Sequence, residues 1–574
     1  MKRIPVGDRV TATFSKRAGV IKLYSDDGIL WPNWTEMAGI ERMAVKSILV
    51  EEGKVFLPED ASGYRREWDD KTRKYRFDFE LFYGKENILT FFGGMRNLKY
   101  LDMNRFDTSN VTNMKGMFFH CESLTDLDIS RLNTSNVTNM ASMFWDCSQL
   151  ASLDLSNFDT SKVIDMSKMF YRCYNLTDID PSGFDTSNVT NMAGMFAGCD
   201  NLTSLNLSGF DTSNVTDMER MFDCCSGLTD PGIKGLDTSK VTNMSQMFQS
   251  CSNLTNLDLS GFDTSKVTNM NKMFNNCVHL TDVDLSSFDT SKVTDMSHMF
   301  GNCFNLKDLD LSSFQTPKLT HIDTMFCNCS KLRSVNMGGI NTANVRDISR
   351  MFCKCISLEH LDLSRFNTTS AENMEYMFYG CESLTELDLS NFDTSNVVNM
   401  LWLFNSCKSL TSLNLKGLHT SKVRNMGGMF ANCANLKSLD LDGFDTSNVI
   451  KMTDMFEGCS SLENLDLSGF NTSKVTDMSY MFHKCAGLRQ LTLKFNTAKV
   501  EDMTHMFKNC ARLESLDLST FDMSGVTDIS EMFRGCKKLK RITMDFVIGR
   551  NTKTSDIFKG CRKTLVCDGK IEEE

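Results

Sequence analysis

Apolar residues recur along the chain with a fixed period of 26 residues. Residues 254–279, LTNLDLSGFDTSKVTNMNKMFNNCVH, are repeated with small changes from residue 98 to residue 561. In this stretch Leu257 and Leu259 flank Asp258, and alternation with a period of two predicts a short strand whose leucines face inward. Residues 261–265 predict a turn after the strand, because short Asp, Thr and Ser side chains hydrogen-bond nearby backbone groups.

The second half of each repeat predicts a short helix. Four apolar columns follow the spacing i, i+3, i+4 and i+7, at Met270, Met273, Phe274 and Cys277. This spacing puts them on one stripe of a helix about two turns long. The column before it, that of Asn269, is Asn or Asp in every coil from Asn113 to Asp528 except at His321 and Lys451. Such a column is typical of a helix N-cap.

One coil of this size cannot bury its own apolar face, so like residues must stack in ladders from coil to coil. The Phe274 column is Phe in all 18 coils, from Phe118 to Phe558. At about 0.8 kcal/mol per buried methylene, we expect the Met and Phe columns to be the main source of stability between coils. The predicted fold is a repeat solenoid of 26-residue coils, with a parallel β-sheet on one side and short helices on the other.

The coils, with their LDLSGFDTS, VTNM and MF-x-x-C segments, resemble the BspA-like leucine-rich repeat family of bacterial and protist surface proteins. The resemblance covers most of the chain. It implies a right-handed solenoid of the α+β leucine-rich repeat type. It also implies a non-enzymatic, often adhesive, role at the cell surface or as a secreted protein.

Three segments are expected along the chain. Residues 1–97 are a hairpin module and a capping coil with an insertion, residues 98–538 are regular repeats, and residues 539–574 are a degenerate capping coil with an acidic tail. Residues 20–24 and 29–31 flank an Asp-Gly turn and predict the hairpin. In the insertion Tyr75, Phe77, Phe79 and Leu81 alternate with charged residues and predict a further strand.

Charge and hydropathy narrow the classes of partner. The formal net charge of −11 argues against nucleic acid, which usually requires a basic stripe. No run of apolar residues is long enough for a membrane span, and the first residues lack the apolar core of a signal peptide. The missing signal favours the cytoplasm, whereas the resemblance favours the cell surface or secretion, and both stay open. A monomer is expected.

The 22 cysteines are mostly a structural feature. Eighteen of them form one column on the inner stripe, and we expect these to be buried, reduced thiols that pack as small apolar groups. Cys327 and Cys353 lie one residue after the Phe column in adjacent coils. Both are expected to be solvent-accessible and close enough to bridge if oxidised.

The sequence contains no pattern typical of a catalytic or cofactor site, so we do not expect an enzyme. The eight histidines, among them His298 and His505 at exposed helix positions, occur singly. The outward Asp258 column is the strongest electrostatic feature, because carboxylates roughly 5 Å apart repel by on the order of 3 kcal/mol at an effective dielectric of 20. Such a ladder needs hydrogen-bond donors, raised pKa values or a row of cations such as calcium, and bonds to neighbouring Ser, Thr and Lys are the simplest solution.

These patterns predict a non-enzymatic binding or adhesion module with a protein or glycan partner. An intracellular protein–protein recognition scaffold is the alternative. The position before the second strand leucine varies freely, which is expected where stacking imposes no choice. With the Asp column beside it, this position predicts a partner-facing surface of Tyr100, Asp126, Asp128, Asp258, Asp284, Asp310, His360, Asp362, Glu386 and Asp388.

Overall fold

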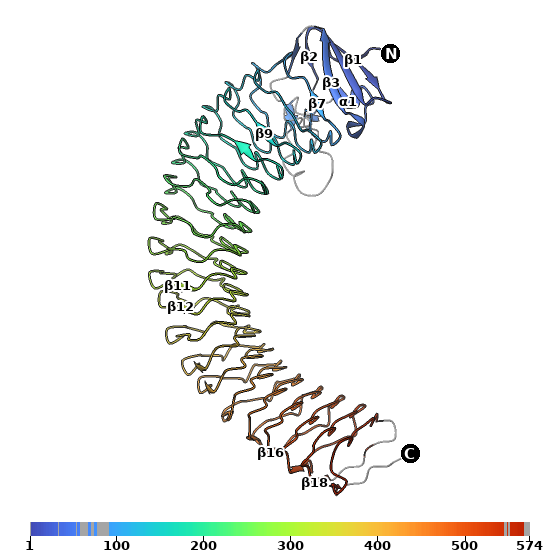
Figure 1. The fold of residues 1–574 in the computed structure, drawn as a ribbon, viewed down its shortest axis with the longest axis vertical. Coiled ribbons are helices and arrows are strands. Elements are labelled where there is room, and N and C mark those ends of the chain that lie inside the picture. The colour runs from blue at the N-terminus through green and yellow to red at the C-terminus, as the bar shows by residue number, and fades with distance from the viewer. Residues whose placement is uncertain are drawn as a thin grey trace. The chain divides into compact units, whose positions relative to one another are not determined.

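The chain folds into a stack of short coils, as the repeat predicts. A computed structural model describes residues 2–31, 34–52, 54–57, 67–69, 74–76, 91–544, 548 and 552–567. The chain divides into two units, Met1–Leu280 and Thr281–Glu574. Within each unit successive coils lie one against the next, so each unit is a β-solenoid with a 26-residue coil (Figure 1).

Regular secondary structure is sparse. In the described part of the chain the helices are α1 (Trp34–Met37) and a 3₁₀ turn at Arg42–Ala44, and neither is long or apolar enough to cross a membrane. The strands are β1 (Ile4–Ser15), β2 (Val20–Leu30), β3 (Ser47–Glu52), β4 (Val55–Phe56), β5 (Glu67–Asp69), β6 (Lys74–Arg76), β7 (Tyr100–Leu101), β8 (Phe106–Asp107), β9 (Ser152–Leu153), β10 (Asp178–Ile179), β11 (Asp308–Asp310), β12 (Ser334–Asn336), β13 (Glu386–Asp388), β14 (Ser412–Asn414), β15 (Asn464–Leu467), β16 (Gln490–Leu493), β17 (Ser515–Asp517), β18 (Arg541–Thr543) and β19 (Val566–Cys567).

The N-terminal hairpin differs from the predicted one. β1 pairs antiparallel with β2, and the turn between them ends at Gly19, whose φ is +69°. The Asp-Gly pair at Asp27 lies inside β2, beside a register shift between Asp8 and Val10. The predicted turn at residues 25–28 is therefore wrong. This segment is a bulge, because the long strand β1 gives β2 a partner along its whole length.

The hairpin continues into the first coils through parallel pairing. β3 pairs with β2 and with β7, where Ile48 lies opposite Leu101. The Phe92 ring stacks on Phe118 at 5.8 Å, so Phe92 stands at the head of the Phe column. In the insertion, β5 and β6 form an antiparallel pair, whereas Phe77, Phe79 and Leu81 of the predicted strand lie outside the described residues.

In the regular coils the strand residues pair in register with a stride of one repeat. Leu309 lies opposite Val335, and Leu465 lies opposite Leu491. Burial alternates along β15 as exposed, buried, exposed, buried, which confirms the inward leucines. A second row of single parallel bridges joins the Asn269 column, as between Asn139 and Asp165. Neighbouring coils are therefore joined by β-type pairing in two places, along the strands and along the Asn269 column.

The predicted short helices are wrong. The segment from Met140 to Cys147 shows how they are replaced: the N–H groups of Met143, Trp145 and Cys147 each bond the carbonyl three residues earlier, at 3.2, 3.2 and 3.1 Å. The alternate N–H groups bond the next coil instead, from Ser142 to Ser167 at 2.8 Å and from Phe144 to Met169 at 2.9 Å. A helix would keep these donors within one coil. We call this segment of each coil the turn ribbon.

The turn ribbon also explains the Asn269 column. The Asn side chain does not cap a helix. At Asn139, directly before the segment just described, Oδ1 accepts from the N–H two residues later, at 2.9 Å, and forms an Asx turn. The ribbon needs left-handed backbone directly before the Cys column, as at Asp146, with a φ of 60°. That column is rich in Gly and Asn, as at Gly198, Gly380, Asn276 and Asn302, and this signal separates the ribbon from a helix.

Each unit has a continuous core of ladders. Phe rings stack at 5.4–6.1 Å from Phe92 to Phe274 in the first unit and at 5.4–5.9 Å from Phe300 to Phe558 in the second. Beside them runs a ladder of buried hydroxyls, in which Thr134 Oγ1 donates to the Asp159 carbonyl at 3.0 Å and accepts from its N–H at 2.8 Å.

Candidate binding surfaces

The strand face is the outer side of the coil strands and consists of two columns, that of Tyr100 and that of Asp258. The Tyr100 column is exposed in every coil from Tyr100 to Arg541, whereas the leucines beside it point inward. Tyr100 itself is 51% exposed. All ten residues of the predicted partner-facing surface are exposed on this face.

The Asp258 column is held by local hydrogen bonds. Asp258 Oδ1 accepts from the N–H of Ser260 at 3.1 Å and from its hydroxyl at 2.7 Å. These bonds hold the pKa of Asp258 below its ordinary value. In β13 and β14 Asp388 lies opposite Asn414, whose amide also helps to lower the pKa of Asp388 after the bonds from Ser390. At Asp258 and Asp388, hydrogen bonds from serine and asparagine stabilise the carboxylate.

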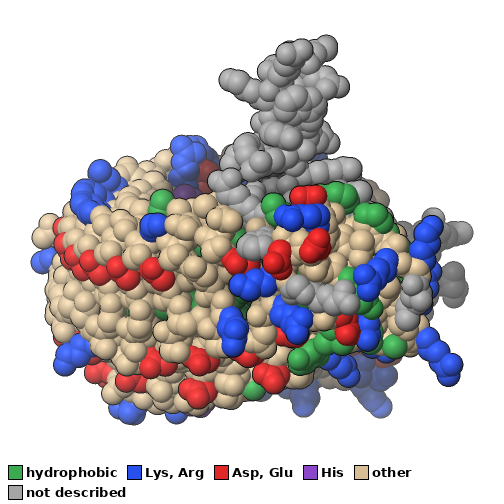
Figure 2. Space-filling model, turned by 90° about the horizontal axis from the view of Figure 1, so that it is seen from above, with side chains coloured by type: hydrophobic (Ala, Val, Ile, Leu, Met, Phe, Trp, Pro, Cys, Tyr) green, Lys and Arg blue, Asp and Glu red, His purple; other side chains and the backbone are tan. Residues whose placement is uncertain are grey.

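The structure groups the predicted surface residues only in part. Asp126 and Asp128 lie in one coil of the first unit. In the second unit His360 and Asp362 lie in one coil, and Glu386 and Asp388 lie in the next, in β13. Acidic side chains line up in rows on the surface seen in Figure 2. Within each unit the predicted residues therefore lie along the strand face and do not converge on one pocket.

One hollow of about 290 Å³ opens on the strand face of the second unit. It lies where Gly338 takes the place of the serine of neighbouring coils, such as Ser312 and Ser364. Its polar lining combines a carboxylate, a guanidinium, an amide and hydroxyls, from Asp362, Arg365, Asn336, Ser312 and Ser364. The hollow can accept a small polar group, and Asp362 is the predicted surface residue that it includes.

The turn ribbon carries a second set of surface residues that the repeat pattern did not reveal. In the second unit Tyr376 and Tyr379 lie 5.4 and 5.6 Å from Trp402, and the Arg350 guanidinium lies 4.9 Å from the Tyr376 ring. Trp402 lies against Gly428, where a Cβ would come within 2.5 Å of the indole. All three aromatic side chains are half-buried. We call Tyr376, Tyr379 and Trp402 the aromatic cluster.

A comparable group lies on the turn ribbon of the first unit. Trp145 is 5.2 Å from Phe119 and 4.9 Å from Tyr171, with the Lys168 ammonium 5.2 Å from its ring. One sequence signal marks both groups: Trp145 and Trp402 are the two tryptophans of the regular coils. Both stand in outward columns of the turn ribbon, where packing does not require a large ring. Trp, Tyr and Arg are also the residues most enriched at binding hot spots.

The sequence suggested that the histidines occur singly, but in the structure several of them contact aromatic or acidic side chains. His505 stacks on Tyr480 at 4.4 Å and lies 6.2 Å from His483, which contacts Glu457 at 3.0 Å. His298 and His505 are half-buried on the turn ribbon instead of exposed on a helix. In the first unit His120 Nδ1 lies 2.5 Å from Asp146 and 3.7 Å from Glu122, and these three side chains could hold a metal ion.

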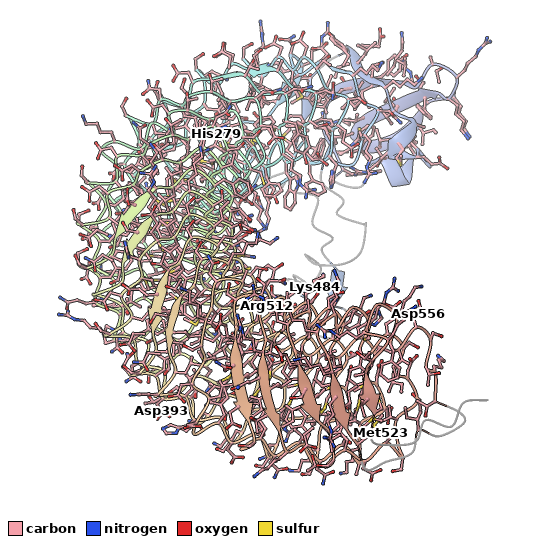
Figure 3. The ribbon with its side chains drawn as sticks, turned by 60° about the horizontal axis from the view of Figure 1, so that its bottom comes forward. His279, Asp393, Lys484, Arg512, Met523 and Asp556 are labelled. Atoms are coloured by element: carbon pink, nitrogen blue, oxygen red, sulfur yellow. The ribbon has the colours of Figure 1, made fainter. Side chains whose placement is uncertain are left out.

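The turn ribbon and the loops after the strands lie at opposite edges of the second unit. Figure 3 places Lys484 and Asp556, both on the ribbon, away from Asp393 and Met523, which belong to those loops. Lys484 contacts Glu457 at 3.4 Å, and Asp556 contacts Arg534 at 3.4 Å. Both ribbon charges therefore have a partner in a neighbouring coil, and Asp556 also contacts Lys559 of its own coil at 2.8 Å. Asp393 instead accepts from the Ser395 N–H within its own loop.

Comparisons with known proteins give a family and a set of similar solved structures. The family model described as "Mycoplasma protein of unknown function, DUF285" matches residues 86–202, 154–232, 228–337, 299–412, 385–469, 403–517 and 463–566. No curated protein sequence matches the chain.

Three of the similar solved structures are bacterial repeat proteins. A leucine-rich repeat protein from Bacteroides ovatus is 14% identical, with 89% of this chain and 94% of that chain covered and a TM-score of 0.36. One from Eubacterium ventriosum is 12% identical, with 98% and 95% covered and a TM-score of 0.21. The functional domain of InlJ from Listeria monocytogenes, described as including a cysteine ladder, is 16% identical, with 73% and 74% covered and a TM-score of 0.17.

Proposed function

The chain belongs to the DUF285 family, and we propose that it is a binding module whose strand face contacts a protein or glycan partner. One observation carries this proposal: the Tyr100 column is exposed in every regular coil, while the Leu257 column that follows it points inward and is fixed by packing. A repeated column that the fold leaves free can vary to suit a partner. Many weak contacts along such a surface bind tightly without a deep pocket.

The two columns of the strand face have different parts in this proposal. The Asp258 column belongs partly to the fold, because its carboxylates close turns on Ser260 and its equivalents. In the Tyr100 column Asp230 accepts a similar bond from the Gly232 N–H, at 2.9 Å, but Tyr100, Asp126, His360 and Glu386 close no such turn in the described structure. This column is therefore the better place for partner recognition. Tyr100, Asp126, His360 and Glu386 are therefore the residues that we assign to the partner.

We place the protein at the cell surface or outside the cell, in line with the sequence resemblance to BspA-like proteins. The alternative is an intracellular recognition scaffold, which the unpaired cysteines favour, because a reducing compartment keeps thiols free. Protease treatment of intact native cells separates the two locations. Loss of the protein from intact cells supports the surface, and survival until lysis supports the interior.

The binding proposal is tested by screening the full chain against glycan arrays and candidate surface proteins. A variant with Tyr100→Ala, Asp126→Lys, His360→Glu and Glu386→Lys is then compared with the wild type. We expect the affinity to fall at least about tenfold, since each interface side chain removed or reversed costs on the order of 1 kcal/mol. Far-UV circular dichroism and hydrogen exchange must show unchanged folding.

The matched control moves the substitutions to the other surface. Tyr376→Ala, Tyr379→Ala and Trp402→Ala truncate the aromatic cluster on the turn ribbon. Under our proposal these changes leave the affinity unchanged. If the affinity survives the strand-face changes and disappears with the ribbon changes, the binding surface is the turn ribbon.

A further inference from the structure

Two cysteines outside the buried ladder lie together on the turn ribbon of the second unit. Cys327 and Cys353 directly follow Phe326 and Phe352, whose rings stack at 5.5 Å. The ribbons of their two coils bond each other through the Asn328 N–H and the Cys353 carbonyl, at 2.7 Å. Paired strands lie about 4.8 Å apart, within the Cα separation of about 4.4–6.8 Å that a disulfide spans.

The two thiols differ in exposure. Cys327 is half-buried and reaches the surface, whereas Cys353 is 6% exposed, so the expectation that both are solvent-accessible is wrong for Cys353. In the column of these two cysteines Gly301, which has no side chain, precedes Cys327, whereas the larger Tyr379 follows Cys353. A partly exposed thiol beside a covered one is the arrangement of an attacking and a resolving cysteine.

The local electrostatics favour a thiolate on Cys327. The neighbouring Cys353 thiol lowers the pKa of Cys327, and the cationic side chains of Lys354 and Arg350 lower it further. The neighbouring Cys327 and burial raise the pKa of Cys353, which keeps its proton. Arg350 is itself fixed in place by Glu375, at 2.6 Å, and by the Tyr376 ring.

The other cysteines show how the surroundings of a thiol change its pKa. Ladder thiols such as Cys329 and Cys355 are fully buried and donate to the carbonyls of Phe300 and Phe326, both at 3.1 Å. Burial raises the pKa of Cys329 and Cys355. Cys224 is more exposed than Cys327, yet desolvation and the Asp223 carboxylate raise the pKa of Cys224 to about 11. Exposure alone therefore does not make a reactive thiol in this protein.

We propose that Cys327 and Cys353 form a reactive dithiol that is oxidised to an intramolecular disulfide by exchange with small disulfides. The Cys327 thiolate attacks one sulfur of the small disulfide, breaks its S–S bond and releases one thiolate, which takes up a proton from water. Cys353 loses its proton to solvent and attacks the Cys327 sulfur of the mixed disulfide, releasing the second small thiol. Two protein thiols are oxidised to one disulfide, and the small disulfide is reduced to two thiols.

This modification site is independent of the partner proposed for the strand face. The new S–S bond would join two adjacent coils directly beside Arg350 and the aromatic cluster. Oxidation would therefore cross-link these two coils covalently.

The first test compares reaction rates in the folded full chain. Brief labelling with iodoacetamide at pH 7, followed by peptide mass spectrometry, measures each cysteine. The pKa of Cys327 is lowered, whereas that of Cys224 is raised to about 11, so Cys327 holds the larger share of thiolate, and the lower nucleophilicity of the more acidic thiol offsets this only in part. We expect Cys327 to react several times faster than Cys224. Equal rates, or faster labelling of Cys224, would overturn the proposal.

The second test uses hydroxyethyl disulfide as the oxidant. The wild type is expected to lose two hydrogens and to yield a peptide pair linked between Cys327 and Cys353. Cys353→Ser should stop at a stable mixed disulfide on Cys327, and Cys327→Ser should give no linked pair. Cys224→Ser is the matched control and should link as the wild type does. A stable mixed disulfide on wild-type Cys327, or links to ladder cysteines instead, would contradict the assignment.

Folding of each variant is checked by hydrogen exchange before oxidation. Serine at either position is expected to leave the protection of the neighbouring coils unchanged, because the ladder cysteines hold the core. If Cys353→Ser unfolds these coils, Cys353→Ala takes its place and must trap the same mixed disulfide for the proposal to stand.

Discussion

Aspartates on the two sides of a coil behave in opposite ways. On the strand face Asp258 is exposed and accepts two hydrogen bonds from Ser260, which favour the carboxylate and lower its pKa. On the turn ribbon Asp454 is half-buried beside Glu457 and Asp477. Burial first, and then these two acidic neighbours, raise the pKa of Asp454 to about 6, although His483 opposes the shift. The charge of Asp454 is therefore unfavourable in the folded chain.

Asp454→Asn is expected to stabilise its part of the second unit at neutral pH. Between about pH 4 and pH 6 folded Asp454 keeps a proton that the unfolded chain has lost, so stability falls as pH rises through this window. The fully buried limit is about 3 kcal/mol, and partial exposure reduces the expected gain at pH 7.5 to about 1–2 kcal/mol. Urea unfolding of the variant and the wild type at pH 7.5 and pH 4 measures the difference, which should vanish at pH 4.

The control for this prediction is Asp258→Asn. Asn206 and Asn336 occupy the same column in other coils, and Asn206 Oδ1 accepts the same bond from Ser208, at 3.3 Å. This change is expected to leave stability unaltered at pH 7.5. Equal stabilisation by both substitutions would mean that the general reduction of negative charge, and not the burial of Asp454, is responsible.

At the scale of one coil, stability comes from contacts with the coils before and after it. Phe430 is fully buried and stacks on Phe404 and Phe456, at 5.6 Å in both cases. Its N–H bonds the Met455 carbonyl of the next coil at 2.9 Å. The ladder and the backbone bonds both join nearest neighbours, so the damage from a lost side chain should stay local.

Phe430→Ala is expected to cost about 3–5 kcal/mol, as buried Phe truncations do. Because each coil couples only to its neighbours, a few coils around residue 430 should lose hydrogen-exchange protection while distant coils of the second unit keep theirs. Exchange followed by mass spectrometry along the chain resolves this pattern. Uniform loss of protection, or none, would contradict nearest-neighbour coupling.

Across the whole chain, stability should follow the quality of strand pairing. Pro181 and Pro231 take the places of inward strand leucines in the first unit, and proline donates no backbone hydrogen bond. β10 ends at Ile179, and the next pairing along this row is the single bridge between Ser204 and Asp230. Both prolines are buried, so they keep the apolar contact but not the bond.

We expect residues 178–235 to be the least protected stretch of the first unit. Native-state hydrogen exchange and limited proteolysis should find early exchange and cleavage there. The double change Pro181→Leu and Pro231→Leu restores both donors and should raise the protection of these coils. Flat protection across residues 178–235 in the wild type would rule out the prolines as a weak point.

The sequence by itself determined the period, the stacking and the inner columns. A spacing of 26 residues and an unbroken Phe column leave one way to bury the apolar residues, namely coils stacked in register. For the same reason the buried cysteine column and the outward strand positions could be identified. Such features depend on which positions are apolar, and a repeated sequence shows the same apolar positions in every coil.

Only the tertiary structure decided which carbonyl groups the backbone N–H groups bond. The spacing of Met270, Met273, Phe274 and Cys277 suits one helical stripe, yet their segment is a ribbon whose alternate N–H groups bond the next coil, as Phe144 bonds Met169. The aromatic cluster, the covered thiol of Cys353 and the pairing of His483 with His505 arise in the same way. Each depends on a neighbour about one repeat away, and the pattern within a single coil does not contain that contact.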